Sequence, residues 1–279
     1  MKRLFNTVGI LFVIYCFLSL VINLINSTSL ELPPNYGSEC REYSLTDSLQ
    51  NVEIQRIHHR TWKKYVYDST YCLSYVLASE VVSPSTIFRN QLDNRERSYE
   101  KYWRNIYFEL HQQDKDLVSF LQDSLENIAT RAQLTRNELA KLIVSFVQDI
   151  PYSYVVQEPC GQRDRPCRGN EKFGILSPVE FLYTLAGDCD TRSVLLYSIL
   201  KHFNFDPLIV ISNEYRHAMI AVDLPAAGDH ILHKGKKFYF WETTATGWLP
   251  GVLPPDTNNI AYWKITLDHE YQTLASRNR

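Results

Sequence analysis

Three features of the sequence predict an α+β protein that is attached to a membrane. The chain begins with an apolar run of spanning length at residues 4–25. Apolar residues then recur at helical spacing through much of residues 97–148. After a further helix, three apolar segments of strand length follow between residues 207 and 244. With 279 residues and a hydrophobic content of 45%, the chain is long enough for one large domain with a helical extension.

The N-terminal run predicts a signal anchor over residues 1–26. Lys2 and Arg3 precede the run, and no cleavage site of the Ala-x-Ala kind follows it, which favours an uncleaved transmembrane helix over a removed signal peptide. At about 1.5 Å per residue, a helix of this length crosses a bilayer. The positive-inside rule then places the rest of the chain outside the cytoplasm, in the bacterial periplasm or at the cell surface. Residues 27–47, which contain prolines and a glycine, are the expected tether.

Residues 48–136 are expected to form an extension that packs on the C-terminal part of the chain. The first part, at residues 61–75, has the pattern of an extended segment. Apolar residues then repeat at near-helical spacing over residues 97–112 and 114–129, which predicts two helices. An aromatic stripe of this kind is more often part of a core than a ligand platform. A Thr-Arg-Asn-Glu capping box predicts a third helix that ends at Gln148.

The segment Gly-Asp-Cys-Asp-Thr-Arg, at residues 187–192, places one cysteine where a loop becomes a helix. Upstream, a Ser-Pro-Val-Glu capping box opens a short helix that is expected to end near Ala186, with Gly187 as its left-handed terminator. Asp188 then caps a second, apolar helix, so Cys189 lies in its first turn. Free N–H groups and the helix dipole stabilise a thiolate there, which predicts a thiol pKa below about 8.5. The alternative for a lone cysteine is a small buried hydrophobic residue.

The segments that follow supply a base and a carboxylate. A continuous apolar run over residues 207–212 predicts a buried strand, and a polar turn leads into a second strand at residues 217–222. His217 therefore stands at a strand entrance. Aromatic and β-branched residues over residues 237–244 predict a third strand, whose single carboxylate is Glu242. Taken alone, each of the two residues is more often a solvated group at a strand end or sheet edge.

Together these residues carry a resemblance: Gly-Asp-Cys-Asp-Thr-Arg opening a helix, His-Ala at a strand start and Trp-Glu-Thr-Thr in the next strand. Over residues 137–251 the chain resembles the transglutaminase-like superfamily, in the branch of bacterial transglutaminase-like cysteine peptidases. The resemblance implies Cys189 as nucleophile, His217 as general base and acid, and Glu242 as the residue that orients the imidazole. It also implies a papain-like α+β catalytic domain over residues 137–274, with the nucleophile helix packed on an antiparallel sheet. The third position is usually aspartate in this superfamily, whereas this chain has glutamate.

The resemblance implies a thiol hydrolase or acyltransferase that attacks a peptide or carboxamide carbonyl and forms a thioester. Hydrolysis is favoured because the resemblance is to peptidases, and transfer of the acyl group to a lysine amine would make the chain a protein-crosslinking transglutaminase. The backbone N–H of Cys189 can hold the oxyanion, and Gln148, Tyr152 and Tyr154 are the candidates for a second donor. A catalytically inactive, tethered binding or assembly module is the alternative outside enzyme chemistry.

The remaining cysteines indicate the compartment, and the composition limits the classes of partner. Cys160 and Cys167 bracket a short polar loop, so a disulfide is expected there in an oxidising compartment, and Cys40 and Cys72 are the other two that can pair. No paired zinc-ligand spacing occurs, so neither a metal nor a cofactor is expected. The net charge of −2 argues against nucleic-acid binding through phosphate neutralisation. The expected partners are a protein or peptide substrate and, through the N-terminal helix, a membrane.

Overall fold

A computed structural model describes residues 43–46, 53–63, 70–269 and 271 of the chain. The predicted membrane anchor and most of the predicted tether lie outside these residues. None of the helices in the described part combines the length and the hydropathy that a membrane span needs. All of the described residues belong to one compact unit.

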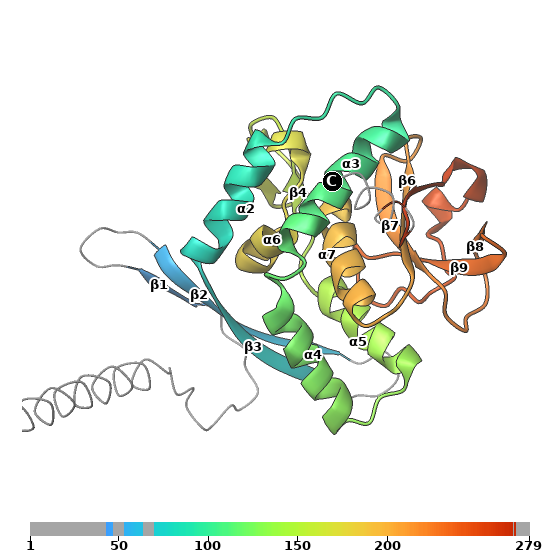
Figure 1. Ribbon diagram of the computed structural model, residues 1–279, viewed down its shortest axis with the longest axis horizontal. Coiled ribbons are helices and arrows are strands. Elements are labelled where there is room, and N and C mark those ends of the chain that lie inside the picture. The colour runs from blue at the N-terminus through green and yellow to red at the C-terminus, as the bar shows by residue number, and fades with distance from the viewer. Residues whose placement is uncertain (1–42, 47–52, 64–69, 270, 272–279) are drawn as a thin grey trace, which may run out of the picture. The chain divides into compact units, whose positions relative to one another are not determined.

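Helices and strands both contribute to this unit, so the predicted α+β class is confirmed (Figure 1). The α-helices of the described residues are α2 (Ser79–Gln91), α3 (Tyr99–Asp114), α4 (Ser119–Arg131), α5 (Arg136–Gln148), α6 (Pro178–Thr184) and α7 (Cys189–His202). The strands are β1 (Tyr43–Thr46), β2 (Glu53–Lys63), β3 (Thr70–Ala78), β4 (Tyr154–Val155), β5 (Cys167–Arg168), β6 (Pro207–Ser212), β7 (His217–Val222), β8 (His230–His233), β9 (Lys236–Trp241) and β10 (Lys264–Leu267). Short 3-10 turns occur at Lys172–Gly174, Pro255–Thr257 and Ile260–Tyr262.

A five-stranded sheet contains His217 and leads directly into Glu242. Its strand order is β10-β6-β7-β9-β8, and every neighbouring pair is antiparallel. The strands predicted at residues 207–212 and 217–222 coincide with β6 and β7. The third predicted strand ends earlier than expected, at Trp241, so Glu242 lies directly after β9 instead of within it. The edge strand β10 was not predicted, because its four residues give too short a pattern.

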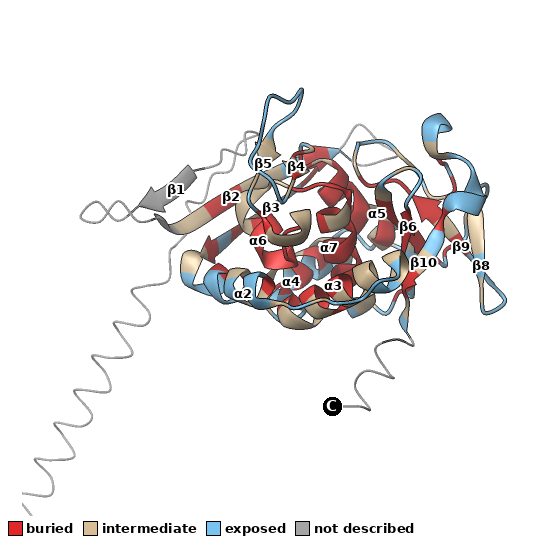
Figure 2. Cartoon of the chain, turned by 90° about the horizontal axis from the view of Figure 1, so that it is seen from above, coloured by how far each residue is buried: buried red, intermediate tan, exposed pale blue. Residues whose placement is uncertain are grey.

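Both faces of this sheet are covered, which explains why all six residues of β6 are buried. Helix α7 packs on β6 and β7, and α3 packs on α7 and β10 (Figure 1). On the helix side, Ile209 and Ala218 of the sheet join a core with Val194 of α7. On the opposite side, Trp263 covers a second core that includes Phe240. The fully buried residues of α5, α6 and α7 appear as the red interior in Figure 2.

The extension predicted over residues 48–136 shares its core with the rest of the unit. Its extended part is the β2–β3 hairpin, and Trp62 from β2 packs edge-on against Phe146 of α5, with 5.2 Å between ring centroids. The indole N–H of Trp62 also donates to the Ser145 hydroxyl at 3.0 Å. Helix α2 was not predicted, since Pro84 lies inside it and weakens the helical signal. Its buried Arg89 forms ion pairs with Glu171 and Glu180, which fasten α2 to the capped start of α6.

The helix boundaries predicted for the segments before the nucleophile are confirmed in part. The Ser177–Glu180 capping box opens α6 as predicted, and the Thr135–Glu138 capping box likewise opens α5, which ends at Gln148 as predicted. Helix α6 ends at Thr184 instead of Ala186, and the left-handed residue is Leu185, with φ of 49°, so the prediction for Gly187 was wrong. Glycine is needed at position 187 for space, because a Cβ there would lie 2.7 Å from the Phe181 ring.

Candidate active site

Cys189 is the first residue of α7, as predicted. The Asp188 carboxylate caps this helix by accepting the Thr191 N–H at 3.1 Å. Val194 and Leu195, further along α7, are completely buried, so the helix is fixed in the interior. The helix packs on β7, and its first residue, Cys189, lies near Ala218 at the start of that strand. The Cys189 side chain is itself buried, with 6% of the residue exposed.

The sheet brings His217 and Glu242 together. In the β7–β9 register Ile220 lies opposite Trp241. Continued by one residue, this register sets Glu242 opposite Met219, on the same sheet face as His217 and diagonal to it. The carboxylate oxygen Oε2 of Glu242 lies 2.8 Å from Nε2 of the His217 imidazole. Glutamate therefore reaches the imidazole across the sheet, and the pairing that the resemblance implied is present.

Three donors fix the other oxygen of the Glu242 carboxylate. The backbone N–H groups of Thr243 and Thr244 donate to Oε1 at 2.8 and 2.9 Å, and the Thr244 hydroxyl donates at 2.7 Å. Burial alone would raise the pKa of this carboxyl, but the hydrogen bonds from His217 and Thr244 lower it to about 2. Glu242 is therefore an anion at neutral pH and holds the proton of His217 on Nε2. The other ring nitrogen, Nδ1, is then the one that can accept a proton.

The thiol of Cys189 contacts both the sheet and an acid of its own helix. The Ala218 N–H, next to His217, points at the sulfur, and the thiol donates to Asp190 Oδ2 at 3.6 Å. Burial raises the pKa of the thiol well above its usual value, and the charges of Asp190 and Asp188 add to the rise. The prediction of a depressed thiol pKa was therefore wrong. The helix dipole contributes about 1 kcal/mol or less, which the burial and two adjacent carboxyls outweigh.

Asp190 is held against the thiol by a residue from the extension. The Tyr107 hydroxyl of α3 donates a short hydrogen bond to Asp190 Oδ1. Burial raises the pKa of Asp190, and burial together with the Asp190 charge raises the pKa of Asp188. The carboxyls of Asp188 and Asp190, the two sequence neighbours of Cys189, disfavour a negative charge on its sulfur. In the resting protein the thiol of Cys189 therefore keeps its proton.

Replacing Asp190 by asparagine is expected to make the thiol ionise at lower pH. The change removes a carboxylate that repels the thiolate but keeps an oxygen that can accept the Tyr107 hydroxyl proton. The measurement is the rate of iodoacetamide labelling of Cys189 as a function of pH, followed by peptide mapping. The Asp190→Asn profile should shift to lower pH, and the profile of Asp116→Asn, a change of an exposed aspartate, should match the unmodified chain. Identical profiles in all three proteins would show that Asp190 does not control the thiol.

Of the three candidates for the second oxyanion donor, the structure brings only Tyr152 to the nucleophile. Its hydroxyl lies near the Cys189 backbone N–H, and Tyr152 forms a parallel β-bridge with Gly187. Burial and the neighbouring Cys189 raise the pKa of this hydroxyl, so it remains a proton donor. Gln148 instead donates its amide to the carbonyls of Glu242 and Trp248, at 2.6 and 3.1 Å.

Tyr154, the remaining candidate, lies further along the chain and belongs to β4. Its hydroxyl donates to Asp164 at 3.4 Å and so points into the neighbouring loop instead of toward Cys189. An oxygen placed beside the Cys189 N–H would meet the hydroxyl of Tyr152 and not that of Tyr154.

Arg192 holds the segments of the site together, a role that the sequence did not reveal. Its guanidinium is completely buried, and burial lowers its pKa to about 10, which still leaves it charged at neutral pH. It donates at 2.6 to 3.2 Å to four backbone carbonyls, those of Val147, Ile150, Gly187 and Thr243. The nucleophile loop, the segment before Tyr152 and the residues after Glu242 are thus joined through one side chain.

Aromatic side chains of α3 form a wall on one side of the nucleophile. Trp103 stacks on Tyr107, with 5.5 Å between ring centroids. Burial, together with the charges of Asp190 and Cys189, raises the pKa of Tyr99 to about 12, which places its hydroxyl near both residues. The sequence predicted these residues as core. Tyr99 and Trp103 are half-buried, which suits these two side chains to contact an acyl group as well.

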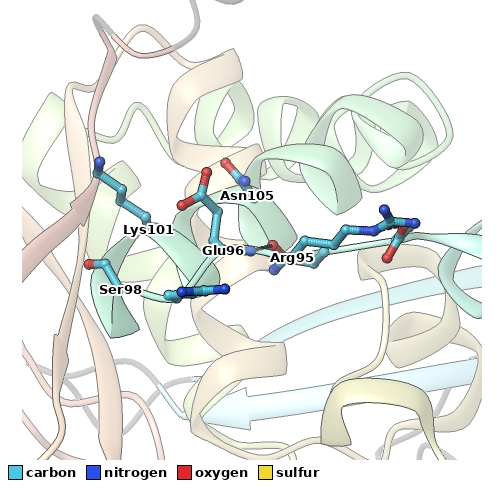
Figure 3. Close-up of a pocket in the computed structure, with 8 residues that line it drawn as sticks. Arg95, Glu96, Ser98, Lys101 and Asn105 are labelled. Carbon is cyan, nitrogen blue, oxygen red and sulfur yellow. Dashed lines mark hydrogen bonds and ion pairs between the residues drawn. The ribbon is translucent and has the colours of Figure 1, made fainter.

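A polar pocket of about 510 Å³ lies before and along the start of α3, apart from these residues (Figure 3). Its lining side chains carry charges of both signs, as Arg95, Glu96 and Lys101 illustrate. None of the three predicted catalytic residues lines it. The candidate active site is therefore the group around Cys189.

No protein-family model, curated protein or solved structure matches this chain. Evidence for a function comes from the chain's own residues and from their geometry.

Proposed function

We propose that this chain is a transglutaminase-like cysteine peptidase or amidase, which hydrolyses peptide or carboxamide bonds through Cys189, His217 and Glu242. The observation that carries the proposal is the 2.8 Å contact between His217 Nε2 and Glu242 Oε2, formed where β7 begins beside the start of α7. An ionised carboxylate that fixes the tautomer of a histidine, with a thiol at the start of the adjoining helix, supports thiol acyl transfer. The α7 helix against an antiparallel sheet supports a papain-like core for the domain.

In the proposed first half-reaction, the Cys189 sulfur attacks the substrate carbonyl carbon while Nδ1 of His217 takes the thiol proton. Because the resting thiol is protonated, attack and proton transfer take place together. The new C–S bond turns the carbonyl oxygen into an oxyanion, which accepts hydrogen bonds from the Cys189 N–H and the Tyr152 hydroxyl. Collapse of this intermediate breaks the C–N bond, and His217 gives its proton to the departing amine.

The acyl group then remains on Cys189 as a thioester. In hydrolysis, water attacks this thioester, His217 accepts a proton from the water, and the C–S bond breaks to return the thiol and release a carboxylic acid. A lysine amine attacking in place of water would form a new amide instead. The two outcomes use the same three residues and differ only in the nucleophile that reaches the thioester.

We also propose that the catalytic domain works outside the cytoplasm, anchored by the N-terminal helix predicted over residues 1–26. The disulfide between Cys160 and Cys167 supports this location, because disulfides persist mainly in oxidising compartments. A cell-wall peptide is one substrate that such a location offers.

Supplying peptides with and without an amine tests the proposed reaction. The full chain would be incubated with a library of short peptides containing glutamine, alone and with a fluorescent primary amine. We expect new free carboxylates, seen by mass spectrometry, to outnumber amine adducts, and Cys189→Ala to form neither product. Predominant amine incorporation would make the chain a transglutaminase. Absence of both products, together with equal labelling of a folded wild type and its His217→Ala variant, would favour the inactive binding module.

A further inference from the structure

The loop closed by the Cys160–Cys167 disulfide is built into the wall of the candidate site. The strand β4 pairs in parallel with β5, and the Tyr154 N–H donates to the Pro166 carbonyl at 2.8 Å. The same stretch of chain begins at Tyr152, whose hydroxyl lies near the Cys189 backbone. The loop is thus tied by a covalent bond and by backbone hydrogen bonds to the segment that borders the nucleophile. Figure 2 shows the chain beside β4 and β5 as exposed.

Two arginines of this loop lie over the tyrosines of that segment. The Arg165 guanidinium is 5.3 Å from the centre of the Tyr152 ring, and that of Arg163 is 5.2 Å from the Tyr154 ring. The two rings meet edge to face, with their centroids 5.6 Å apart. Stacking on an aromatic ring is worth about 0.5–1 kcal/mol at an exposed site and restrains the planar guanidinium. Both arginines are therefore held over the segment that borders the nucleophile.

These two guanidiniums keep their charge available. Within the described part of the chain, neither Arg163 nor Arg165 forms an ion pair, whereas the nearby Arg168 is paired with Glu171. The single acid of the loop, Asp164, accepts a hydrogen bond from the Tyr154 hydroxyl at 3.4 Å. Both arginine side chains are exposed. A carboxylate of a peptide that binds here can therefore accept paired hydrogen bonds from the guanidinium of either arginine.

We propose that this enzyme selects acidic peptides, with Arg163 and Arg165 binding carboxylates close to the scissile carbonyl. Only the Tyr152 ring separates the Arg165 guanidinium from the region of the Cys189 N–H, so Arg165 is placed to meet a side chain a few residues from the bond that Cys189 attacks. The arginines act on binding and take no part in the bond-making steps. This inference rests on the proposed function, since it names the substrate class of the same site.

Binding to an inactive variant tests the inference without any need for turnover. In the Cys189→Ala protein, the affinity of a fluorescent octapeptide with two glutamates would be compared by anisotropy with that of its glutamine counterpart. We expect the glutamate peptide to bind about tenfold more tightly at low salt, with the difference shrinking as salt is added. The added change Arg163→Gln with Arg165→Gln should abolish the difference.

Arg136→Gln provides the matched control. Arg136 also stacks on an aromatic ring, 4.1 Å from the centre of Phe205, but it opens α5, at the opposite end of that helix from Gln148. The preference for glutamate should survive this change. Equal affinity for the two peptides, no binding of either, or a preference that the double change leaves intact would overturn the inference.

Turnover by the protein that retains Cys189 separates this inference from the proposed function. Neutral and acidic peptides cleaved equally well would remove the acidic preference and leave the proposed function standing. Tight binding of the glutamate peptide without any cleavage would leave the acidic preference standing and remove the proposed function. A preference that appears mainly in KM, with kcat unchanged, is the pattern expected of residues that bind and do not react.

Discussion

Glu242→Gln should lower kcat about ten-thousand-fold while the protein remains folded. The glutamine amide presents N–H groups to Nε2 of His217, so the imidazole turns to the tautomer that carries its proton on Nδ1. That nitrogen can then no longer accept the proton of the Cys189 thiol. The amide oxygen can still accept the hydrogen bonds of Thr243 and Thr244, which preserves the local backbone. The measurement is kcat on the best peptide found in the library, together with a thermal unfolding curve for each protein.

Glu214→Gln is the matched control for this change. Glu214 lies in the exposed turn before His217, close to the site in sequence but outside the hydrogen bonds of the imidazole. The control should keep wild-type kcat. A Glu242→Gln enzyme within about tenfold of wild type would mean that the carboxylate does not set the tautomer of the histidine.

The second large effect concerns stability. Arg192→Met should lower the free energy of unfolding by about 3–5 kcal/mol, because it leaves four buried carbonyl oxygens without the hydrogen bonds that the guanidinium donates. Methionine fills much of the same volume, so the loss of hydrogen bonds and charge accounts for most of the change. Urea unfolding followed by circular dichroism measures it. Arg131→Met, at the exposed end of α4, should change the free energy by less than about 0.5 kcal/mol.

A stable Arg192→Met protein would overturn this account of the site's framework. Equal urea midpoints for the Arg192 and Arg131 variants would show that the four carbonyls find other donors. A protein that unfolds early but regains activity when a stabilising ligand is bound would still agree with the account, since Arg192 positions the catalytic segments and does not react.

Local signals were sufficient for the elements that surround the nucleophile. The capping boxes at Thr135 and Ser177 are closed within four residues, so the sequence alone specifies where α5 and α6 begin. The continuous apolar run of β6 and the entrance of β7 at His217 were predicted at their observed positions. The disulfide between Cys160 and Cys167 spans a short loop and was also expected correctly.

The protonation state of Cys189 was beyond a local prediction. The first turn of a helix favours a thiolate, and this effect depends only on neighbours in sequence. The position of the Asp190 carboxylate depends on Tyr107, a residue of α3 that lies 83 positions away in the chain. Burial is likewise a property of the packed molecule. The thiol pKa therefore follows from tertiary contacts that a pattern of residue types does not contain.

The same distinction applies to the second oxyanion donor. Gln148, Tyr152 and Tyr154 were equivalent in sequence, since all three precede the nucleophile. The β-bridge between Tyr152 and Gly187 distinguishes the three candidates, because it brings Tyr152 alone to the start of α7. The Gln148 amide donates its hydrogen bonds to the carbonyls of Glu242 and Trp248, roughly a hundred residues further along the chain.

The most direct test of the proposed chemistry is to trap the acyl group on Cys189. The chain would be mixed with an activated acyl ester, quenched in acid within milliseconds and mapped by mass spectrometry. We predict an acyl group on Cys189 that hydroxylamine removes, formed quickly by the wild type and slowly by His217→Ala. Substrate turnover without any adduct on Cys189, or equal rates of Cys189 acylation in the two proteins, would contradict the mechanism.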